Sequence, residues 1–172
     1  MTPNCIFITQ GEHAISDDPD VTISTLLGSC VACCLWDPVA QVGGMNHMLI
    51  TNRSQRDAQC DAAGVHAMEL LINDLLKRGA RRNRLKAKAF GGAQMVNGLS
   101  GIGAANCAFT VEYLQRENIP CVSQSLGSDV ARQLRFWPVT GAAHQKIVRK
   151  EILNEVAQSL PEQPRGHGLE FL

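Results

Sequence analysis

Apolar positions along the chain alternate between runs typical of buried strands and polar segments typical of loops. The segment Val21 to Trp36 is almost continuously apolar, which predicts a strand covered on both faces. Asp37-Pro38 is a turn signal, and the apolar stretch Met45 to Ile50 follows it. These segments predict a β-hairpin. The preceding residues, GEHAISDDPDVT, have the composition of a turn-rich lead-in.

Helical spacing first appears after the polar segment 51–59. Asp61 is a suitable N-cap and Gly79 a suitable C′ residue for a helix between them. Its apolar positions repeat at helical spacing: Val65, Met68, Leu71, Ile72, Leu75 and Leu76. Beyond it the pattern predicts strands at 85–89, 119–124, 133–137 and 142–149, a helix near 104–115 and a short helix around 152–156.

The order of these elements predicts a single-domain α/β protein with a mixed, largely antiparallel sheet, because most neighbouring strands are joined by tight turns. The length of 172 residues fits one domain. We expect the domain to span residues 1–160 and the tail 161–172 to be mobile.

Composition excludes several function classes. The formal net charge is zero, so the chain has no basic field for nucleic acid or an anionic membrane. No apolar run is long enough for membrane insertion, and the first residues lack signal-peptide character, so we expect a cytoplasmic protein. Its seven cysteines have no framework spacing, which favours reduced thiols that mostly fill the core.

Cys30 and Cys33 form a C-x-x-C pair within the first apolar run. A zinc site needs about four ligands, and the remaining cysteines are scattered singly, so we expect no metal. A redox pair needs both sulfurs on one side, whereas strand residues three apart face opposite ways. Cys30 is therefore either a small core residue or a single reactive thiol.

The predicted hairpin brings a histidine to that thiol. With a loop at 37–40, Cys30 faces His47, and a loop one residue longer would bring Met48 there instead. An adjacent imidazole can take the thiol proton, and the resulting ion pair would lower the thiol pKa below about 8.5. Gly28 and Ser29 could leave backbone N–H groups free to stabilise an oxyanion. The alternative is that Cys30 is buried filler and His47 a core histidine.

A glycine-rich loop follows the strand that ends near Gly91-Gly92. Asn106 stands where a dinucleotide fingerprint needs its third glycine, so the loop does not indicate nucleotide binding. We expect it to lie beside the Cys30 strand, with Asn106 bonding backbone near the site.

Five motifs, in this order, resemble those of the CheD family, the chemoreceptor glutamine deamidases of bacterial chemotaxis. The resemblance covers roughly residues 8–148. One departure is Ser128, where a second glycine usually follows Gly127. The motifs are LGSC at 27–30, GGMNH at 43–47, GGAQM at 91–95, IGAAN at 102–106, and Arg132 followed by TG at 140–141.

The resemblance implies an amidohydrolase that converts receptor glutamines to glutamates through a cysteine thioester. It implies Cys30 as nucleophile, His47 as base and a hydroxyl residue just before the cysteine as the third member, with Thr25 favoured over Ser24. It also implies a three-layer α/β/α sandwich and no metal or organic cofactor. Methyl-accepting chemoreceptors are the implied substrates, and a CheC-type phosphatase is an implied partner.

Two other functions stay open at this stage. A non-catalytic adaptor would use the same fold to bind a CheC-type phosphatase or receptors, and it would tolerate loss of Cys30 or His47. A general cysteine peptidase would release backbone cleavage products instead of ammonia.

Overall fold

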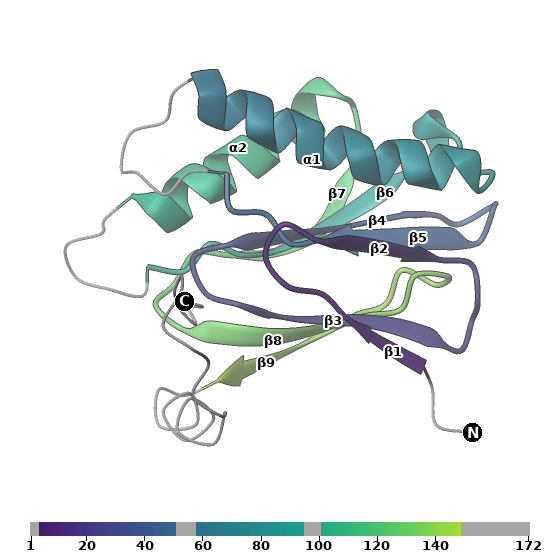
Figure 1. Cartoon of the computed structure of the whole chain (residues 1–172), viewed down its shortest axis with the longest axis horizontal. Coiled ribbons are helices and arrows are strands. Elements are labelled where there is room, and N and C mark those ends of the chain that lie inside the picture. The colour runs from purple at the N-terminus through teal and green to yellow at the C-terminus, as the bar shows by residue number, and fades with distance from the viewer. Residues whose placement is uncertain (1–3, 51–57, 95–100, 149–172) are drawn as a thin grey trace, which may run out of the picture.

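The computed structural model describes residues 4–50, 58–94 and 101–148. Short loops join most elements, and two helices and two sheets stack in layers (Figure 1). The elements in chain order are β1 (Asn4–Phe7), β2 (His13–Ser16), β3 (Val21–Leu27), β4 (Val31–Asp37), β5 (Val42–Asn46), α1 (Ala58–Lys77), the 3-10 turn η1 (Arg82–Arg84), β6 (Lys86–Gly91), α2 (Ile102–Arg116), β7 (Cys121–Leu126), β8 (Ala131–Phe136) and β9 (Ala143–Val148).

The described strands form two separate sheets. One has four strands in the order β1-β3-β8-β9, and the other has five in the order β2-β5-β4-β6-β7. The pairs β1–β3 and β6–β7 are parallel, and the other pairs are antiparallel. The predicted α/β class and its mixed, largely antiparallel pairing are confirmed.

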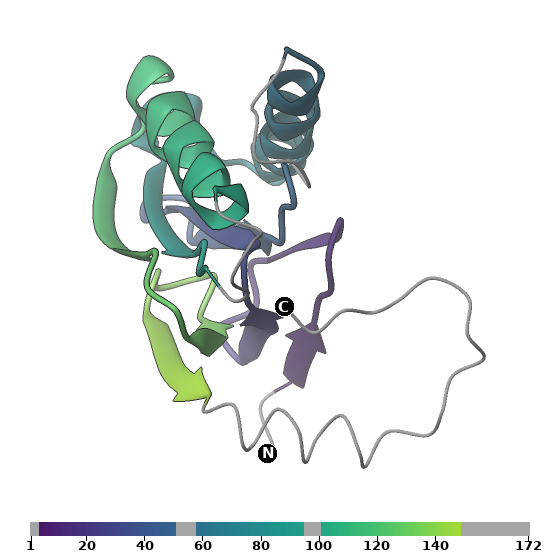
Figure 2. The same ribbon diagram turned by 90° about the vertical axis from the view of Figure 1, so that its left-hand side faces the viewer.

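Both helices cover the same face of the five-stranded sheet (Figure 2). The core between them contains Leu35 of β4, Leu71 of α1 and Phe109 of α2, all fully buried. Gly64 of α1 permits close helix packing, because a Cβ there would lie 2.5 Å from the Phe109 ring. Packing of apolar side chains therefore fixes α2 against the sheet and against α1.

A second apolar core fills the space between the two sheets. Cys34 and Trp36 of β4 meet Leu27 of β3 and Phe136 of β8 there. All seven residues of β4 are buried, since alternate side chains enter the helix-side core and the inter-sheet core. The prediction that the first apolar run is covered on both faces holds for β4.

The expected order of layers is corrected. In the described part of the chain the layers run helices, five-stranded sheet, four-stranded sheet, and no helix covers the outer face of the four-stranded sheet (Figure 2). The three-layer α/β/α arrangement is therefore replaced by an α/β/β one. An apolar strand requires a cover on each face, but its composition does not say whether a helix or a sheet provides it.

The apolar run 21–36 is not one strand. It divides into β3 and β4, which belong to different sheets, and residues 28–30 carry the chain across. Cys30 consequently lies in a loop between two sheets.

The hairpin register also differs from the predicted one. Trp36 pairs with Gly43 instead of Gln41, because the loop starts one residue later, at Pro38. The Asp37 carboxylate fixes this loop by accepting hydrogen bonds from the backbone N–H groups of Val39 and Ala40, at 2.8 and 3.0 Å. Cys30 and His47 are therefore not directly opposite each other.

The remaining predictions concern element boundaries. Helix α1 begins three residues before the expected Asp61, and Gly79 follows its end with φ +101°. Strand β2 lies in the segment predicted as a lead-in. The short helix expected near 152–156, the domain end at 160 and the tail 161–172 lie outside the described residues. No helix in the described ranges is long and apolar enough to cross a membrane.

Candidate active site

His47 immediately follows β5, and its ring is hydrogen-bonded to β3 of the other sheet. The distance from His47 Nδ1 to Thr25 Oγ1 is 2.7 Å. The Thr25 hydroxyl donates its one proton to the carbonyl oxygen of Ile8, also at 2.7 Å. Thr25 can therefore only accept from Nδ1–H. This fixes the neutral imidazole with its lone pair on Nε2, the form that a general base requires.

Ser24, the second candidate hydroxyl, faces away from His47. Its Oγ donates to the carbonyl oxygen of Leu134 at 2.8 Å and contributes to a pocket on the outer face of the four-stranded sheet. Neighbouring strand residues point to opposite faces, so Thr25 faces the inter-sheet space and Ser24 does not. The geometry favours Thr25 as the residue that orients the imidazole.

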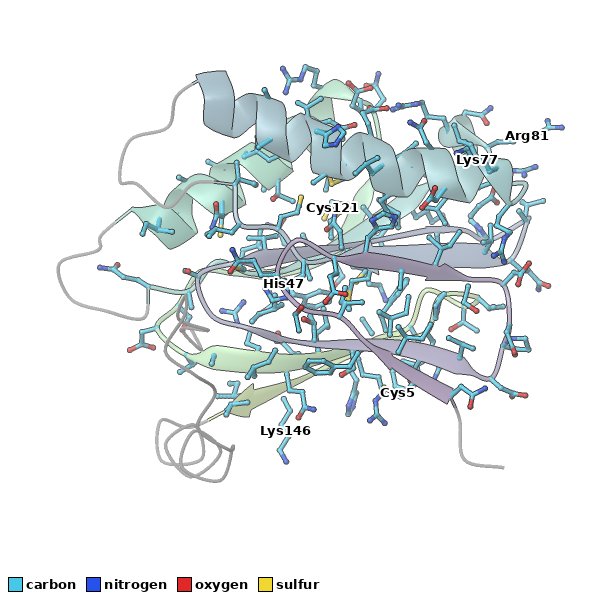
Figure 3. The ribbon with its side chains drawn as sticks, in the orientation of Figure 1. Cys5, His47, Lys77, Arg81, Cys121 and Lys146 are labelled. Atoms are coloured by element: carbon cyan, nitrogen blue, oxygen red, sulfur yellow. The ribbon has the colours of Figure 1, made fainter. Side chains whose placement is uncertain are left out.

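Cys30 and His47 lie on the same side of a backbone bridge. Val31 and Met48 exchange two backbone hydrogen bonds, of 3.0 and 2.7 Å, and their side chains enter the helix-side core. Cys30 belongs instead to the inter-sheet core, the side on which His47 reaches Thr25. Figure 3 shows His47 between the two sheets. Diagonal neighbours of this kind have Cα atoms about 7–8 Å apart, within reach of an imidazole.

Burial leaves both groups neutral in the resting site. Cys30 is 4% exposed, and this burial raises its thiol pKa to about 11. Burial also lowers the pKa of His47 to about 4, although the charge of Glu12 acts in the opposite direction. The resting pair is therefore thiol and imidazole, not the expected ion pair, because neither charged form is well solvated between the sheets.

The loop before the sulfur carries unpaired donors. Among the described residues, the N–H groups of Ser29 and Cys30 donate to no acceptor, and the buried Ser29 Oγ has no hydrogen-bond partner. The carbonyl oxygens of this loop are paired, that of Gly28 with Ala93 N and that of Cys30 with Gly92 N. Ser29 is one of the two predicted oxyanion candidates, and its N–H group and that of Cys30 are available for such a role.

Gly91 and Gly92 provide the space for this close approach. A Cβ at Gly91 would lie 2.3 Å from the carbonyl oxygen of Cys30, and one at Gly92 would lie 2.0 Å from the sulfur of Cys107. Both glycines also have positive φ, of 110° and 69°. These two positions therefore support the loop through backbone contact alone, as expected from the sequence.

Asn106 of α2 links the loop to the segment after His47. Its Nδ2 donates to the carbonyl oxygen of Ser29 at 2.8 Å, and its Oδ1 accepts from Ile50 N at 3.2 Å. The side chain is fully buried. Asn106 thus makes the backbone contacts predicted for it, and it connects the two chain segments that bear Cys30 and His47.

Sequence reasoning missed three contributors from the first turn of the chain. Ile8 supplies the carbonyl that orients Thr25, Gln10 contacts the Cys30 sulfur, and Glu12 lies near enough to His47 to affect its pKa. Glu12 lies in the segment predicted as a turn-rich lead-in, Ile8 and Gln10 lie just before it, and no motif marks any of the three. The role of Arg132 was also missed, although its motif was noted: this buried guanidinium donates to the carbonyl oxygens of Gly91, Ser125 and Gly127.

A pocket of about 200 Å³ opens beside His47. Residues of the β1–β2 loop, of the segment after β5 and of α1 line it, among them Glu12, Leu49 and Leu70. Leu70 is 43% exposed, so the rim offers apolar surface as well as polar groups. Cys30 is not among the residues that line this pocket, so the pocket lies beside the proposed base and not at the sulfur.

Comparison with known proteins gives consistent matches. A family model described as "CheD chemotactic sensory transduction" matches residues 48–147. A protein of Caulobacter vibrioides called "Probable chemoreceptor glutamine deamidase CheD" is 50% identical over 145 residues, which cover 83% of this chain and 78% of that protein. Proteins of the same name from Agrobacterium fabrum and Rhizobium johnstonii are 50% and 45% identical, each match covering 96% of this chain and 95% of the relative.

Two solved structures overlap with part of the chain. Bacillus licheniformis hypothetical protein YfiH has a TM-score of 0.46 at 15% identity, covering 66% of this chain and 49% of its own. Neisseria meningitidis protein NMB0706 has a TM-score of 0.48 at 9% identity, covering 73% and 64%. Both TM-scores are below 0.5, so neither similarity supports a conclusion about this chain.

Proposed function

Because this chain belongs to the CheD family, we propose that it is a chemoreceptor glutamine deamidase in which Cys30 is the nucleophile and His47 its base. This assignment of residues rests on one observation, the hydrogen bond between His47 Nδ1 and the Thr25 hydroxyl. Because Nδ1 is engaged in this bond, Nε2 is the free base on the side of Cys30. The reaction converts a receptor glutamine to glutamate and releases ammonia.

The neutral resting pair decides how the first step proceeds. A thiol with a pKa near 11 is almost entirely protonated at neutral pH, so His47 Nε2 takes its proton as the sulfur attacks the carboxamide carbon. This is general-base catalysis, which does not require a preformed thiolate.

The tetrahedral intermediate carries a negative oxygen beside the loop 28–30. The unpaired N–H groups of Ser29 and Cys30 are the donors for that oxygen, with the Ser29 hydroxyl as a further candidate. Protonated His47 then gives its proton to the leaving amine, and ammonia departs. The thioester that remains is hydrolysed by water that His47 activates, which restores the thiol and yields the carboxylate.

The residues of the site act by themselves in this scheme, without a metal or organic cofactor. We place the reaction in the cytoplasm, where the signalling domains of chemoreceptors would present their glutamines. A CheC-type phosphatase stays a predicted partner, and a purely adaptor role is the competing function. The complete set of Cys30, His47 and Thr25 favours catalysis, because an adaptor has no need of an oriented base.

The test is deamidation of a helical chemoreceptor fragment by the purified protein. We expect ammonia release and conversion of specific glutamines to glutamates, measured by mass spectrometry of the fragment. Cys30→Ala and Cys30→Ser should abolish both while preserving the circular dichroism spectrum. Intact deamidation by these variants would refute the assignment of Cys30, and backbone cleavage of the fragment would indicate a peptidase instead.

A further inference from the structure

One glutamine of the chain itself lies at the proposed nucleophile. The Cys30 thiol donates a hydrogen bond to Gln10 Oε1 over 3.9 Å. Since a C=O bond is about 1.23 Å long, the carboxamide carbon of Gln10 is within about 5 Å of the sulfur. We propose, on the basis of the thiol chemistry assigned above, that Gln10 is an intramolecular substrate that Cys30 converts to glutamate.

The backbone that directly follows Gln10 is hydrogen-bonded to the backbone of His47. Gly11 N donates to the carbonyl oxygen of His47 at 2.9 Å, and His47 N donates to the carbonyl oxygen of Glu12 at 3.0 Å. Thr9 N in turn donates to a carboxylate oxygen of Glu12 at 2.9 Å. The β1–β2 loop therefore holds the backbone of Gln10 beside the segment that bears the base.

Gln10 reaches the sulfur from the surface. The residue as a whole is exposed, whereas Cys30 is 4% exposed. Its carboxamide thus enters along a path from solvent to the thiol, as the glutamine of another protein would. Among the described residues, no other glutamine side chain is hydrogen-bonded to Cys30.

Tethering favours reaction of this glutamine. A group held beside its reaction partner can reach an effective molarity of about 10⁵ M or more, far above the concentration of any receptor. The carboxamide of Gln10 already contacts the sulfur through its oxygen, so attack requires the adjoining carbon to move closer to the sulfur. A site that can deamidate an external glutamine should therefore deamidate Gln10 first.

The step balances without any further reagent. The Cys30 proton passes to His47 Nε2 while the sulfur bonds to the carboxamide carbon, and the C–N bond breaks as the nitrogen takes that proton and leaves as ammonia. Water then attacks the thioester and transfers a proton to His47, the C–S bond breaks, and the sulfur regains a proton. The net change converts the Gln10 side chain and one water molecule to a glutamate side chain and ammonia.

Peptide mass spectrometry of residue 10 tests this proposal. We expect freshly purified wild-type protein to carry glutamate at position 10, or to convert to it on incubation, and Cys30→Ala and Cys30→Ser to retain Gln10. Gln41, an exposed glutamine at the far end of β4, reports spontaneous deamidation and should stay unchanged in all three proteins.

Activity on the receptor fragment, measured with the same preparation, separates the two hypotheses. A wild-type protein that deamidates the fragment but keeps Gln10 intact would overturn this inference and leave the proposed function standing. A protein that modifies neither would overturn both. Conversion of position 10 to glutamate in the Cys30 variants would show that the change is spontaneous and would also overturn the inference.

Discussion

Thr25 and His47 belong to different layers of the protein, and a 2.7 Å hydrogen bond joins their side chains across the space between the two sheets. The bond exists only while the sheets are packed together. The orientation of the proposed base therefore depends on the inter-sheet core, in which Leu27, Met45 and Phe136 are fully buried. This relationship allows the roles of the neighbouring residues to be tested one at a time.

Replacing Thr25 should disable the base without removing it. Thr25→Val preserves shape but cannot accept from Nδ1–H, so the imidazole loses its fixed tautomer. We expect kcat for receptor deamidation to fall by roughly 10²-fold, the scale of a general-base contribution. Thr25→Ser should retain most activity, and Ser24→Ala, on the opposite face of β3, should leave it unchanged. Equal losses in Thr25→Val and Ser24→Ala would contradict the assignment.

Alkylation of Cys30 by iodoacetamide should follow the pKa of a buried thiol. Because burial raises this pKa to about 11, the rate in the resting protein should be low at neutral pH and should climb through the alkaline range. Peptide mapping distinguishes Cys30 from the exposed Cys5, which serves as an internal reference. A rate that levels off below pH 8 would show a preformed thiolate and would contradict a neutral resting pair.

The stability of the protein should depend on the protonation of His47. Its pKa is about 4 in the folded protein and about 6.5 in an exposed imidazole, so between these values the unfolded chain binds a proton that the folded chain does not. The free energy of unfolding should therefore decrease as the pH falls from 6.5 to 4, by up to about 3 kcal/mol from this group.

Urea denaturation at several pH values measures that dependence. Carboxylates also titrate near pH 4. The informative quantity is therefore the slope of the unfolding free energy against pH, compared between wild type and His47→Gln. We expect the variant to lose much of the decrease between pH 6.5 and 5. Parallel curves for the two proteins would mean that His47 titrates normally in the folded state.

Asn106 should position the nucleophile loop. Asn106→Ala leaves the buried carbonyl of Ser29 and the N–H of Ile50 without partners, which should cost about 1–3 kcal/mol of stability. It should also lower kcat with less effect on KM, because the loop shifts relative to His47. Thr110→Val is the matched control, since the Thr110 hydroxyl donates to the backbone carbonyl of Asn106 within the same helix. A similar loss of kcat in both variants would indicate general destabilisation of α2.

Ser128 should carry backbone strain. Its φ of 69° lies in the left-handed region, where a side chain is unfavourable. Ser128→Gly should raise the free energy of unfolding by a few tenths to about 1 kcal/mol. Gly127→Ala, at φ 88° with no atom within 4 Å of the added Cβ, should lower it for the same reason. Thermal denaturation measures both, and stabilisation by Gly127→Ala would contradict this explanation.

Much of the fold follows from local patterns in the sequence. The helix around Leu71 and the strands near residues 121–148 are close to their predicted positions, because periodicity and turn residues mark them. The separation of β3 from β4 was not predictable from composition, since a buried strand and two strands in different sheets share the same apolar character. The hairpin register depended on how Asp37 bonds its own loop, which residue spacing does not reveal.

The candidate site likewise combines residues that the sequence identified with properties that only the fold decides. Cys30 and His47 were identified through their motifs and Thr25 through the family resemblance, and all three border the inter-sheet space in the structure. The predicted ion pair between Cys30 and His47 was wrong, because the protonation of the two groups depends on their burial and not on their spacing in the sequence. Gln10 could not be found from the sequence, since only the fold of the β1–β2 loop brings it to the sulfur.

Acid-quenched mass spectrometry of the enzyme with a receptor peptide measures the proposed intermediate itself. If Cys30 attacks the carboxamide, the enzyme should gain the mass of the peptide less one ammonia, with the bond mapped to Cys30 and removed by hydroxylamine. Cys30→Ser should form no such thioester. Steady deamidation of the peptide with no trappable adduct at Cys30, or with an adduct on another residue, would contradict the account.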